Sequence, residues 1–484
     1  MELGQHPEAD QALRKILART GRPEAALVYA LNLILWNKTF HNLARAAVDK
    51  FTVGHGHLEP AITLFRARLA HVIRDYKSAV LLFEKALEFD EKCVETHASY
   101  SEALWCSLRF EKAVIHSERA LEINNKNHLA LKTRARIAYD SGDLNLAEEL
   151  YRKATDLRPW KWDVSHSRGV FHILRAKFST GWKLMCEDSE SAPWNVERVS
   201  PDKPIWNGRQ LKQGKLLIVA EQGFGDAIQM FRYVKIISKR VGGVAILCHP
   251  TLERLFKEAA PEISITTWGT KTPDHDAWIP MFFLPKLCAE KFTNGQGSGP
   301  YLAASQHLAE KWRHKFGATF SVGLAWAGNP DHQKDSLRSM DPKKLGDLVS
   351  MPGAQFYRLQ PNRRGLGELD GQLPNNITDL STHITDFADT AAIISGLDLV
   401  ISVDTSVAHL AGALGTPVWL LLPYAADWRW LRDREDSPWY PQMRIFRQEK
   451  LGDWLPAIRK VQLHLASEIE AHLNTNHSAQ KSAT

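Results

Sequence analysis

The chain has 484 residues and a net charge of +6 at pH 7, and 44% of its residues are hydrophobic and 24% charged. This length predicts two to four domains, and the composition is that of a globular protein, which excludes general disorder. No apolar run approaches the roughly 20 residues that a membrane-spanning helix needs, and the start lacks the pattern of a signal peptide. We therefore expect a cytoplasmic protein with no transmembrane segment. The basic residues are dispersed and no nucleic-acid-binding motif occurs, so no nucleic acid is expected as a partner.

Five cysteines lie far apart and form no CxxC pair. An odd, scattered set argues against a disulfide framework and against a thiolate zinc site. We expect small buried thiols in a reducing compartment.

The N-terminal third carries a repeat of 34 residues. Small residues recur at this spacing in three series, which are Ala67, Ser101 and Ala135; Ala79, Ala113 and Ala147; and Ala86, Ala120 and Ala154. Two antiparallel helices of such a unit need small side chains where they cross. The pattern matches tetratricopeptide (TPR) repeats at their small positions, although the Trp and the first Tyr are absent. We predict a TPR-type α-solenoid over residues 1–187, with clear repeats at about 60–159 and degraded flanking or capping helices at 9–58 and 160–187.

The composition changes after residue 187. Residues 188–214 are polar, contain proline and lack periodicity, which predicts a linker. Beyond it, strands and helices alternate in two sets that a glycine-rich segment at 294–300 divides, so we predict an N-terminal Rossmann-like lobe at 215–300 and a C-terminal nucleotide-binding lobe at 301–473, with a cleft between them. Residues 474–484 are predicted to be a disordered tail. The predicted strands are 215–220, 244–249, 263–268, 320–326, 354–360, 397–403 and 418–423.

Ligands of parallel sheets gather at the carboxyl ends of the strands. The strand at 215–220 is followed by Gly223, Gly225 and Asp226. The glycines permit a tight turn and let a ligand approach the backbone, and the next helix N-terminus favours anions. Ile228 occupies the third glycine position of a dinucleotide fingerprint, so the segment is not one. Asp226 is expected to face the inter-lobe cleft; alternatively, it only caps the helix.

The strand at 397–403 is followed by Asp404, Thr405, Ser406 and, one turn later, His409. Thr405 or Ser406 can cap the next helix, whose free N–H groups would then face a phosphate. His409 would touch a ribose or diphosphate; alternatively, it is a packed histidine. The polar loop at 327–339 offers Lys334 or Arg338 to neutralise a leaving diphosphate.

Two further features are less informative. The aromatic residues at 423–430 and 437–441 either stack on a base or sugar or pack the lobe. Asp274 and Asp276 form a DxD string, which binds metal and diphosphate in one class of transferases, but its context favours a plain loop. We expect no metal site. The absence of HExxH, GxxxxGK[ST] and GxSxG disfavours zinc proteases, P-loop NTPases and α/β-hydrolases.

Residues 215–234, 323–339, 386–417 and 418–448 together resemble bacterial TPR-containing glycosyltransferases whose catalytic half is similar to the heptosyltransferases. The resemblance covers roughly residues 204–454. It implies a GT-B fold with the nucleotide-sugar donor mainly on the C-terminal lobe, the acceptor facing the N-terminal lobe, and no obligatory metal or other cofactor.

The resemblance also carries roles over to single positions. Asp226 matches the aspartate that acts as general base on the acceptor hydroxyl. The donor segment is matched by Asp404, Thr405, Ser406 and His409, and Arg338 is placed like the basic residue that steadies the diphosphate. The expected donor site consists of this segment and Arg338, together with Gly223 and Gly225; Asp226 is the expected catalytic residue.

The expected function is transfer of a sugar from a nucleotide-sugar to an acceptor docked on the repeats. TPR-fused relatives include enzymes that modify flagellin or other proteins, so a protein acceptor is expected. Two alternatives stay open: a TPR scaffold with a non-catalytic GT-B domain, and a transferase that acts on lipopolysaccharide or another glycan.

Overall fold

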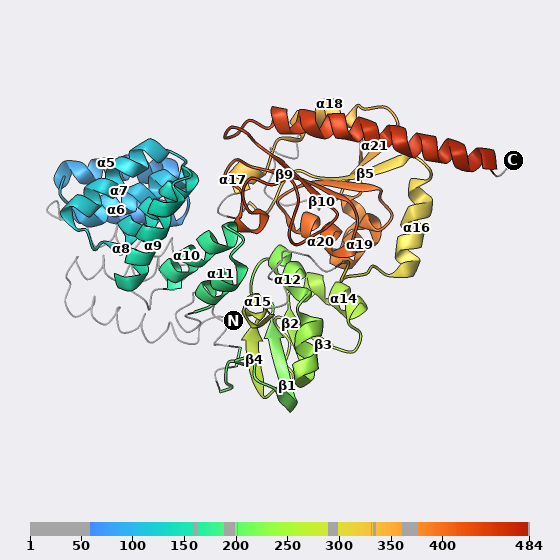
Figure 1. The fold of residues 1–484 in the computed structure, drawn as a ribbon, viewed down its shortest axis with the longest axis horizontal. Helices are drawn as coiled ribbons and strands as arrows, with labels where there is room; N and C mark the ends of the chain where they lie inside the picture. The colour runs from blue at the N-terminus through green and yellow to red at the C-terminus, as the bar shows by residue number, and fades with distance from the viewer. Residues whose placement is uncertain are drawn as a thin grey trace. The chain divides into compact units, whose positions relative to one another are not determined.

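The structure is a computed structural model that describes residues 59–157, 162–187, 199–200, 202–288, 299–330, 332, 335–360 and 376–482. The chain separates into two compact units, Met1–Arg168 and Gly169–Thr484 (Figure 1). Four predicted features lie wholly or partly outside the described residues: the helices at 9–58, residues 188–198 and 201 of the linker, most of the glycine-rich segment and Lys334.

The first unit consists of antiparallel helix pairs (Figure 1). The pairs are α4 (Glu59–Val72) with α5 (Tyr76–Phe89), α6 (Val94–Cys106) with α7 (Phe110–Ile123), and α8 (His128–Asp140) with α9 (Leu144–Leu157). The second helices of successive pairs start 34 residues apart, at Tyr76, Phe110 and Leu144. All nine small residues of the three predicted series are buried. The predicted α-solenoid with its 34-residue register is therefore confirmed.

The turn inside each pair holds a residue with positive φ, at Arg74, Leu108 and Gly142. This conformation is unfavourable for side chains other than glycine, yet it recurs at the repeat spacing because the helix pair imposes it. Ala176, with φ 58°, continues the series. It joins α10 (Trp162–Leu174) to α11 (Phe178–Met185), so these two helices form a fourth pair in the same register.

The fourth pair replaces alanine by glycine at its small positions. Gly169 follows Ala135, and Gly181 follows Ala147, each by 34 residues. A Cβ atom on Gly169 would lie 2.8 Å from the carbonyl oxygen of Gly181, so the two helices touch backbone to backbone. The repeat register thus continues to Met185, close to the predicted boundary at residue 187. By packing, however, the second compact unit starts at Gly169, because the apolar face of α11 belongs to the core of that unit.

Charged side chains form a buried group on the first helices of the pairs. The Glu102 carboxylate lies 3.3 Å from Nζ of Lys132, 3.2 Å from Nη1 of Arg136 and 3.8 Å from Nε2 of His71. Burial alone would raise the pKa of Glu102, but Lys132 and Arg136 outweigh it and lower the pKa to about 2. The carboxylate is therefore charged over the whole physiological range and stabilises the cations around it.

Replacing Glu102 by alanine is expected to lower the free energy of unfolding by about 3 kcal/mol, because the buried cations lose their counter-charge. Denaturant unfolding of the full chain at pH 7, followed by circular dichroism, measures this. Glu122→Ala is the control, since its carboxylate is 64% exposed and its loss should change stability by less than about 0.5 kcal/mol. A lowered pKa means that the stabilisation is present above pH 4.5 and is lost as the pH falls toward 2. Equal unfolding of both variants at pH 7 would contradict the prediction.

The second unit contains two parallel sheets. The first consists of β1 (Leu211–Val219), β2 (Val241–Cys248), β3 (Ser264–Thr267) and β4 (Ala277–Pro280), in the order β3-β2-β1-β4. The second consists of β5 (Phe320–Ala325), β6 (Ala354–Arg358), β7 (Ile377–Asp379), β8 (Leu399–Val403), β9 (Val418–Leu422) and β10 (Met443–Arg447), in the order β10-β9-β8-β5-β6-β7. Both orders reverse direction next to the first strand of the lobe, as in Rossmann folds. The prediction of two Rossmann-like lobes is confirmed.

Helices cover both faces of the second sheet. Successive residues of β9 alternate between two apolar clusters: Leu420 belongs to one, and Trp419 and Leu421 belong to the other. Such strands are apolar at every position because neither face meets water. The second cluster includes residues of α21 (Leu455–Ser482), which runs along this lobe (Figure 1).

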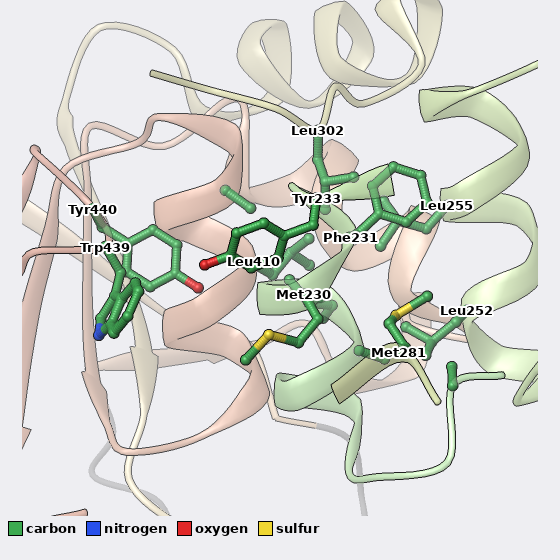
Figure 2. Packing of buried hydrophobic residues seen from close by; sticks show 14 of the residues in the cluster. Met230, Phe231, Tyr233, Leu252, Leu255, Met281, Leu302, Leu410, Trp439 and Tyr440 are labelled. Carbon is green, nitrogen blue, oxygen red and sulfur yellow. The ribbon is translucent and has the colours of Figure 1, made fainter. Parts of the chain in front are cut away.

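The two lobes share one apolar core. Helix α12 (Phe224–Phe231) of the first lobe packs on α20 (Ser406–Leu414) of the second. Figure 2 shows Met230 and Tyr233 beside Leu410 and Tyr440, which come from different lobes. At the rim, Arg254 of α14 (Pro250–Ala259) pairs with Asp386 and Asp389 at the start of α19 (Phe387–Ile394).

Several predicted boundaries need correction. The helical segment that follows β1 is broken into α12, α13 (Val234–Ile237) and a 3₁₀ turn. Strand β1 begins within the predicted linker, and α21 continues to Ser482, so the predicted disordered tail is helical over most of its length. The sequence analysis missed β4, β7, β10, α16 (Gln306–Phe316) and α21.

The sequence analysis expected no disulfide framework and no transmembrane segment. All five cysteines fall within the described residues and are free thiols. Among those residues, no helix has the length and apolar character needed to cross a membrane.

Candidate functional site

Charged side chains gather where the two lobes meet, at the carboxyl ends of parallel strands. Asp226 follows β1, Arg338 follows β5, Asp404 follows β8 and Arg429 follows β9. The strand order reverses at β1 and β4 in the first sheet and at β5 and β8 in the second. Crevices at such switch points are where open parallel sheets bind ligands. The predicted site residues of both lobes are thus brought to one place.

Two helix N-termini meet at this place. A Cβ atom on Gly225 of α12 would lie 2.8 Å from Cδ2 of His409 and 3.6 Å from Cα of Ser406, both in α20. Gly225 is therefore required by the close approach of the lobes, which differs from the tight turn that was predicted for it. Gly223 is the N-cap residue of α12, and a Cβ atom there would lie 3.1 Å from the Asp226 carboxylate.

Asp226 occupies the third position of α12 and is not its N-cap residue. Its carboxylate accepts a hydrogen bond from the backbone N–H of Gly223, as the acidic residue of a capping box does. The same carboxylate pairs with the guanidinium of Arg429 from the other lobe. Asp226 therefore has a capping contact and also faces the inter-lobe contact, so both interpretations of this residue describe part of its surroundings.

Arg429 lies in the 3₁₀ turn η10 (Trp428–Trp430) after β9. Its Nη2 donates to Oδ1 of Asp226, its Nε to Oε1 of Gln229 at 3.0 Å, and its Nη1 to Oδ1 of Asp427 at 2.6 Å. The guanidinium carbon lies 4.1 Å from the ring centroid of Trp428. Because Asp226 and Gln229 belong to α12, one guanidinium holds the two lobes together.

The pKa values in this region depart from their ordinary range, as is common at functional sites. Burial raises the pKa of Asp226, and the guanidinium of Arg429 opposes the rise. Burial and the nearby Asp427 raise the pKa of Asp404 to about 6. Burial also raises the pKa of Glu221 to about 8. The site thus contains carboxyl groups whose pKa values differ.

His409 is a packed, neutral histidine. It is 4% exposed, its Nδ1 lies 2.8 Å from the hydroxyl of Tyr440, and its ring stacks on Trp430 with 5.1 Å between centroids. Burial and repulsion from Arg429 hold its pKa well below the ordinary value. The interpretation of His409 as a packed residue fits this geometry, and a role as a cation does not.

The turn before α20 carries Asp404 and Thr405, and Ser406 is the first residue of the helix. Thr405 is the N-cap residue, but within the described chain its side chain makes no capping hydrogen bond. Its Oγ1 lies 3.1 Å from Oγ of Ser402. The expected cap by the Thr405 side chain is therefore not formed. Asp404 and Thr405 are buried, whereas Ser406 is half-buried at the first turn of the helix.

Arg338 contacts the turn that follows β8. It ends α17 (Asp335–Arg338), donates from Nη1 to the backbone carbonyl of Asp404 at 2.8 Å and from Nε to Oδ1 of Asp335 at 3.1 Å. A Cβ atom on Gly328 would lie 2.5 Å from its Nη2, so this glycine makes room for the guanidinium. The sequence analysis expected Arg338 to contact a diphosphate; in the structure its hydrogen bonds go to the backbone carbonyl of Asp404 and to Asp335.

Replacing Arg338 by alanine is expected to weaken nucleotide-sugar binding about tenfold, because the turn that carries Asp404 loses a charge-assisted hydrogen bond. Titration calorimetry with a donor that the unchanged protein binds measures the effect. Arg444→Ala is the control, since this arginine is 39% exposed and pairs with Glu435 at 3.7 Å. Unchanged affinity in Arg338→Ala would argue against the role.

Four of the five aromatic residues at 423–430 and 437–441 pack the lobe, whereas Tyr424 is 48% exposed. Trp428 meets Trp182 edge to face at 5.4 Å between centroids, and Trp439 meets Phe178 at 5.3 Å. Trp428, Trp430, Trp439 and Tyr440 are all buried. Of the two interpretations given for these segments, packing is the one that the contacts support.

The DxD string lies at the opposite end of the first sheet. Asp276 immediately precedes β4, and its Oδ2 accepts a hydrogen bond from the backbone N–H of Lys215 at 2.8 Å. In the part of the chain that the structure describes, no group of three acidic, histidine or cysteine side chains is arranged to hold a metal ion. The interpretation of this string as a loop agrees with its position.

The sequence analysis missed Glu221, Gln229, Asp427 and Arg429 as members of the site. The segment of Arg429 was considered only for its aromatic residues. The signal that was available is an Asp-Trp-Arg-Trp sequence directly after a strand that is apolar at every position. A carboxylate and a guanidinium at such a strand end are candidates for a buried ion pair.

Comparisons with known proteins agree with this architecture. Residues 363–447 match glycosyltransferase family 9 (heptosyltransferase), and residues 133–159 match the tetratricopeptide repeat. The first match includes the donor segment at 404–409 and Arg429. The chain thus combines tetratricopeptide repeats with a glycosyltransferase family 9 domain.

Individual proteins resemble the chain more distantly. Protein FlbA of Caulobacter vibrioides (strain ATCC 19089 / CIP 103742 / CB 15) is 27% identical over 332 residues, which are 62% of this chain and 54% of that protein. The chain therefore spans about half the length of this curated relative. The glycosyl transferase family 9 structure from Veillonella parvula DSM 2008 has a TM-score of 0.39 at 11% identity and covers 56% of this chain and 100% of its own. A thermophilic TPR protein in Thermus thermophilus, TTC0263, has a TM-score of 0.33 at 13% identity, with coverages of 36% and 94%.

Proposed function

We propose that this protein is a metal-independent GT-B glycosyltransferase that moves a sugar from a nucleotide-sugar donor to a hydroxyl group of an acceptor. The family 9 match over the second lobe supports sugar transfer. The observation that carries the proposal is the meeting of the α12 and α20 N-termini at the switch points of two Rossmann-like sheets, with Asp226 on one side and Asp404 on the other.

The acceptor hydroxyl must lose a proton as its oxygen attacks the anomeric carbon. In the proposed mechanism the Asp226 carboxylate accepts this proton while the new C–O bond forms. The bond between the anomeric carbon and the phosphate oxygen breaks, and its electron pair leaves with the nucleotide. Asp226 suits this role because it lies on the lobe expected to face the acceptor and is only partly exposed, at 21% of its side chain.

The departing nucleotide gains negative charge. The N-terminal turn of α20 offers backbone N–H groups that can receive it, and the bond from Arg338 to the Asp404 carbonyl holds this turn in place. Fixed donors of this kind stabilise developing charge without a metal ion. His409 contributes packing and a hydrogen bond to Tyr440, and remains uncharged.

Titration calorimetry with a panel of UDP-, GDP-, ADP- and CMP-sugars tests the proposal. Binding of one donor, followed by acceptor-dependent release of its nucleotide, is the expected result. The absence of binding to every donor would favour the alternative, a TPR scaffold with a non-catalytic transferase domain.

We also propose that the repeats dock a protein acceptor, because tetratricopeptide repeats present extended surfaces suited to proteins. The full chain is incubated with the donor identified in the panel, isotopically labelled in its sugar, and with a cell extract divided into protein and lipopolysaccharide fractions. Label in the protein fraction is expected, and label confined to the lipopolysaccharide would favour a glycan acceptor.

A further inference from the structure

Among the described residues, two arginines form ion pairs between the lobes, and their carboxylate partners differ. Arg254 lies at the rim with 42% of its side chain exposed, and it pairs with Asp386 and Asp389. Arg429 is 13% exposed and pairs with Asp226. A contact that served only to join the lobes would have no need to use the carboxylate at the switch point.

Each of the three guanidinium nitrogens of Arg429 donates a hydrogen bond, and together these bonds fix the position of Asp226. A guanidinium is planar and presents its N–H donors at fixed angles. Here Nε is committed to Gln229 and Nη1 to Asp427, which leaves Nη2 aimed at Oδ1 of Asp226. Gln229 lies three residues after Asp226 on α12, so the guanidinium holds two successive turns of one helix face. The carboxylate therefore has a defined position relative to the second lobe.

We infer that Arg429 is a positioning residue for Asp226: reaching across from the second lobe, it orients the carboxylate and keeps it charged for proton transfer, so that the base works only when the lobes are seated together. This inference rests on the proposed function and adds to it. A buried carboxylate without a cation takes up a proton, and a protonated Asp226 cannot accept the proton of an acceptor hydroxyl.

Other titratable groups lie near this ion pair. Asp427 beside η10 and Glu221 after β1 interact with the Asp226 carboxyl group itself. Asp404 after β8 and His409 on α20 interact with the Arg429 guanidinium, and Arg338 is bound to the Asp404 carbonyl. Glu221 and His409 are neutral at pH 7, since burial raises the pKa of the first to about 8 and lowers that of the second. The main opposing effects on Asp226 are thus the cation of Arg429 and the anion of Asp427, which shares the same guanidinium.

This balance predicts shifts of opposite sign. Arg429→Gln removes the cation and keeps hydrogen-bonding groups, so the protonation midpoint of Asp226 is expected to rise by about one to two pH units. Asp427→Asn removes the anion that shares the Arg429 guanidinium with Asp226, so the protonation midpoint of Asp226 is expected to fall. Arg429→Lys keeps the positive charge and loses the planar set of N–H donors. In this variant the protonation midpoint of Asp226 is expected to stay close to that of the unchanged protein, while turnover falls about tenfold.

The midpoint is measured without reference to catalysis. The full chain is labelled with ¹³C at aspartate carboxyl groups, and infrared spectra of each variant and of the same variant carrying Asp226→Asn are subtracted across a pH series. Arg254→Gln is the matched control, because it also removes an arginine that joins the lobes through two carboxylates, and the midpoint of Asp226 is expected not to move in it. The acid limb of the rate profile, measured with the donor identified above, is expected to shift with the infrared midpoint.

An unchanged midpoint in Arg429→Gln and in Asp427→Asn would overturn the inference, as would equal shifts in Arg429→Gln and Arg254→Gln. If Arg429→Gln fails to fold, the Asp427→Asn shift and the turnover of Arg429→Lys decide, and wild-type turnover in the lysine variant overturns the positioning role. Infrared shifts of the expected signs in a protein that transfers no sugar would refute the proposed function and leave the link between Arg429 and Asp226 standing.

Discussion

Replacing Asp226 by asparagine is expected to lower the turnover of sugar transfer by about a thousandfold, within the range found for removal of a general base. Asparagine has nearly the same shape, and its carbonyl oxygen still accepts hydrogen bonds from Gly223 and Arg429. What it loses is the ability to accept a proton. Affinity for the nucleotide-sugar is expected to stay unchanged, because the donor segment lies on α20 and Asp226 lies on α12.

Turnover and calorimetric affinity measured on the same preparation separate the two quantities. Asp276→Asn is the matched control: it is the same substitution, in the same lobe, at the amino end of β4, where the side chain accepts a hydrogen bond from Lys215. Because burial raises the pKa of Asp226 and the proposed base must be deprotonated, activity of the unchanged protein should decline with falling pH at a higher pH than 3.8, the ordinary value for an aspartate. Wild-type turnover in Asp226→Asn would remove this residue from the role of base.

The repeat was readable from the sequence because its small residues obey one geometric rule. Two helices that cross closely accept only small side chains, so Ala79, Ala113 and Ala147 had to recur at the repeat spacing. The fourth pair follows the same rule with Gly169 and Gly181. The sequence analysis therefore predicted helices at 160–187 but described them as degraded, because glycine replaces alanine at these positions.

Strands buried on both faces were readable as apolar runs, as for β8 and β9. The short strand β7 has only three residues, and β10 alternates apolar residues with arginine, so neither has that signal. Helix α21 escaped detection because its C-terminal part is polar and resembles a loose tail in composition.

The sequence was enough to predict the two carboxylates of the candidate site, Asp226 and Asp404, but not the arginine that pairs with Asp226. Asp226 and Asp404 stand directly after strands, and the rule that ligands bind at strand ends selects them. Arg429 lies 203 residues from Asp226, and only the packing of α12 on α20 brings the two together. The role of Gly225 was misjudged for the same reason, since the neighbour that forbids a side chain there is His409 of the other lobe.

A single methyl group at Gly225 is therefore expected to lower turnover by about a hundredfold while the protein stays folded. The added Cβ atom would lie 2.8 Å from Cδ2 of His409. His409 has little freedom to move, since Tyr440 holds its Nδ1 at 2.8 Å and Trp430 covers its ring. The start of α12 must then move away from α20, and it takes Asp226 with it. A misplacement of about 1 Å is enough to reduce catalysis about a hundredfold.

The stability of Gly225→Ala is expected to change little, because alanine in a helix gains up to about 1 kcal/mol over glycine and offsets part of the clash. Gly346→Ala in α18 (Gly346–Val349) is the control, since a Cβ atom there meets no described atom within 4 Å. Turnover with the identified donor and the free energy of unfolding are measured for both variants. Wild-type turnover in Gly225→Ala would mean that the lobes tolerate a wider spacing at the switch point, and that the contact between α12 and α20 does not set the position of Asp226.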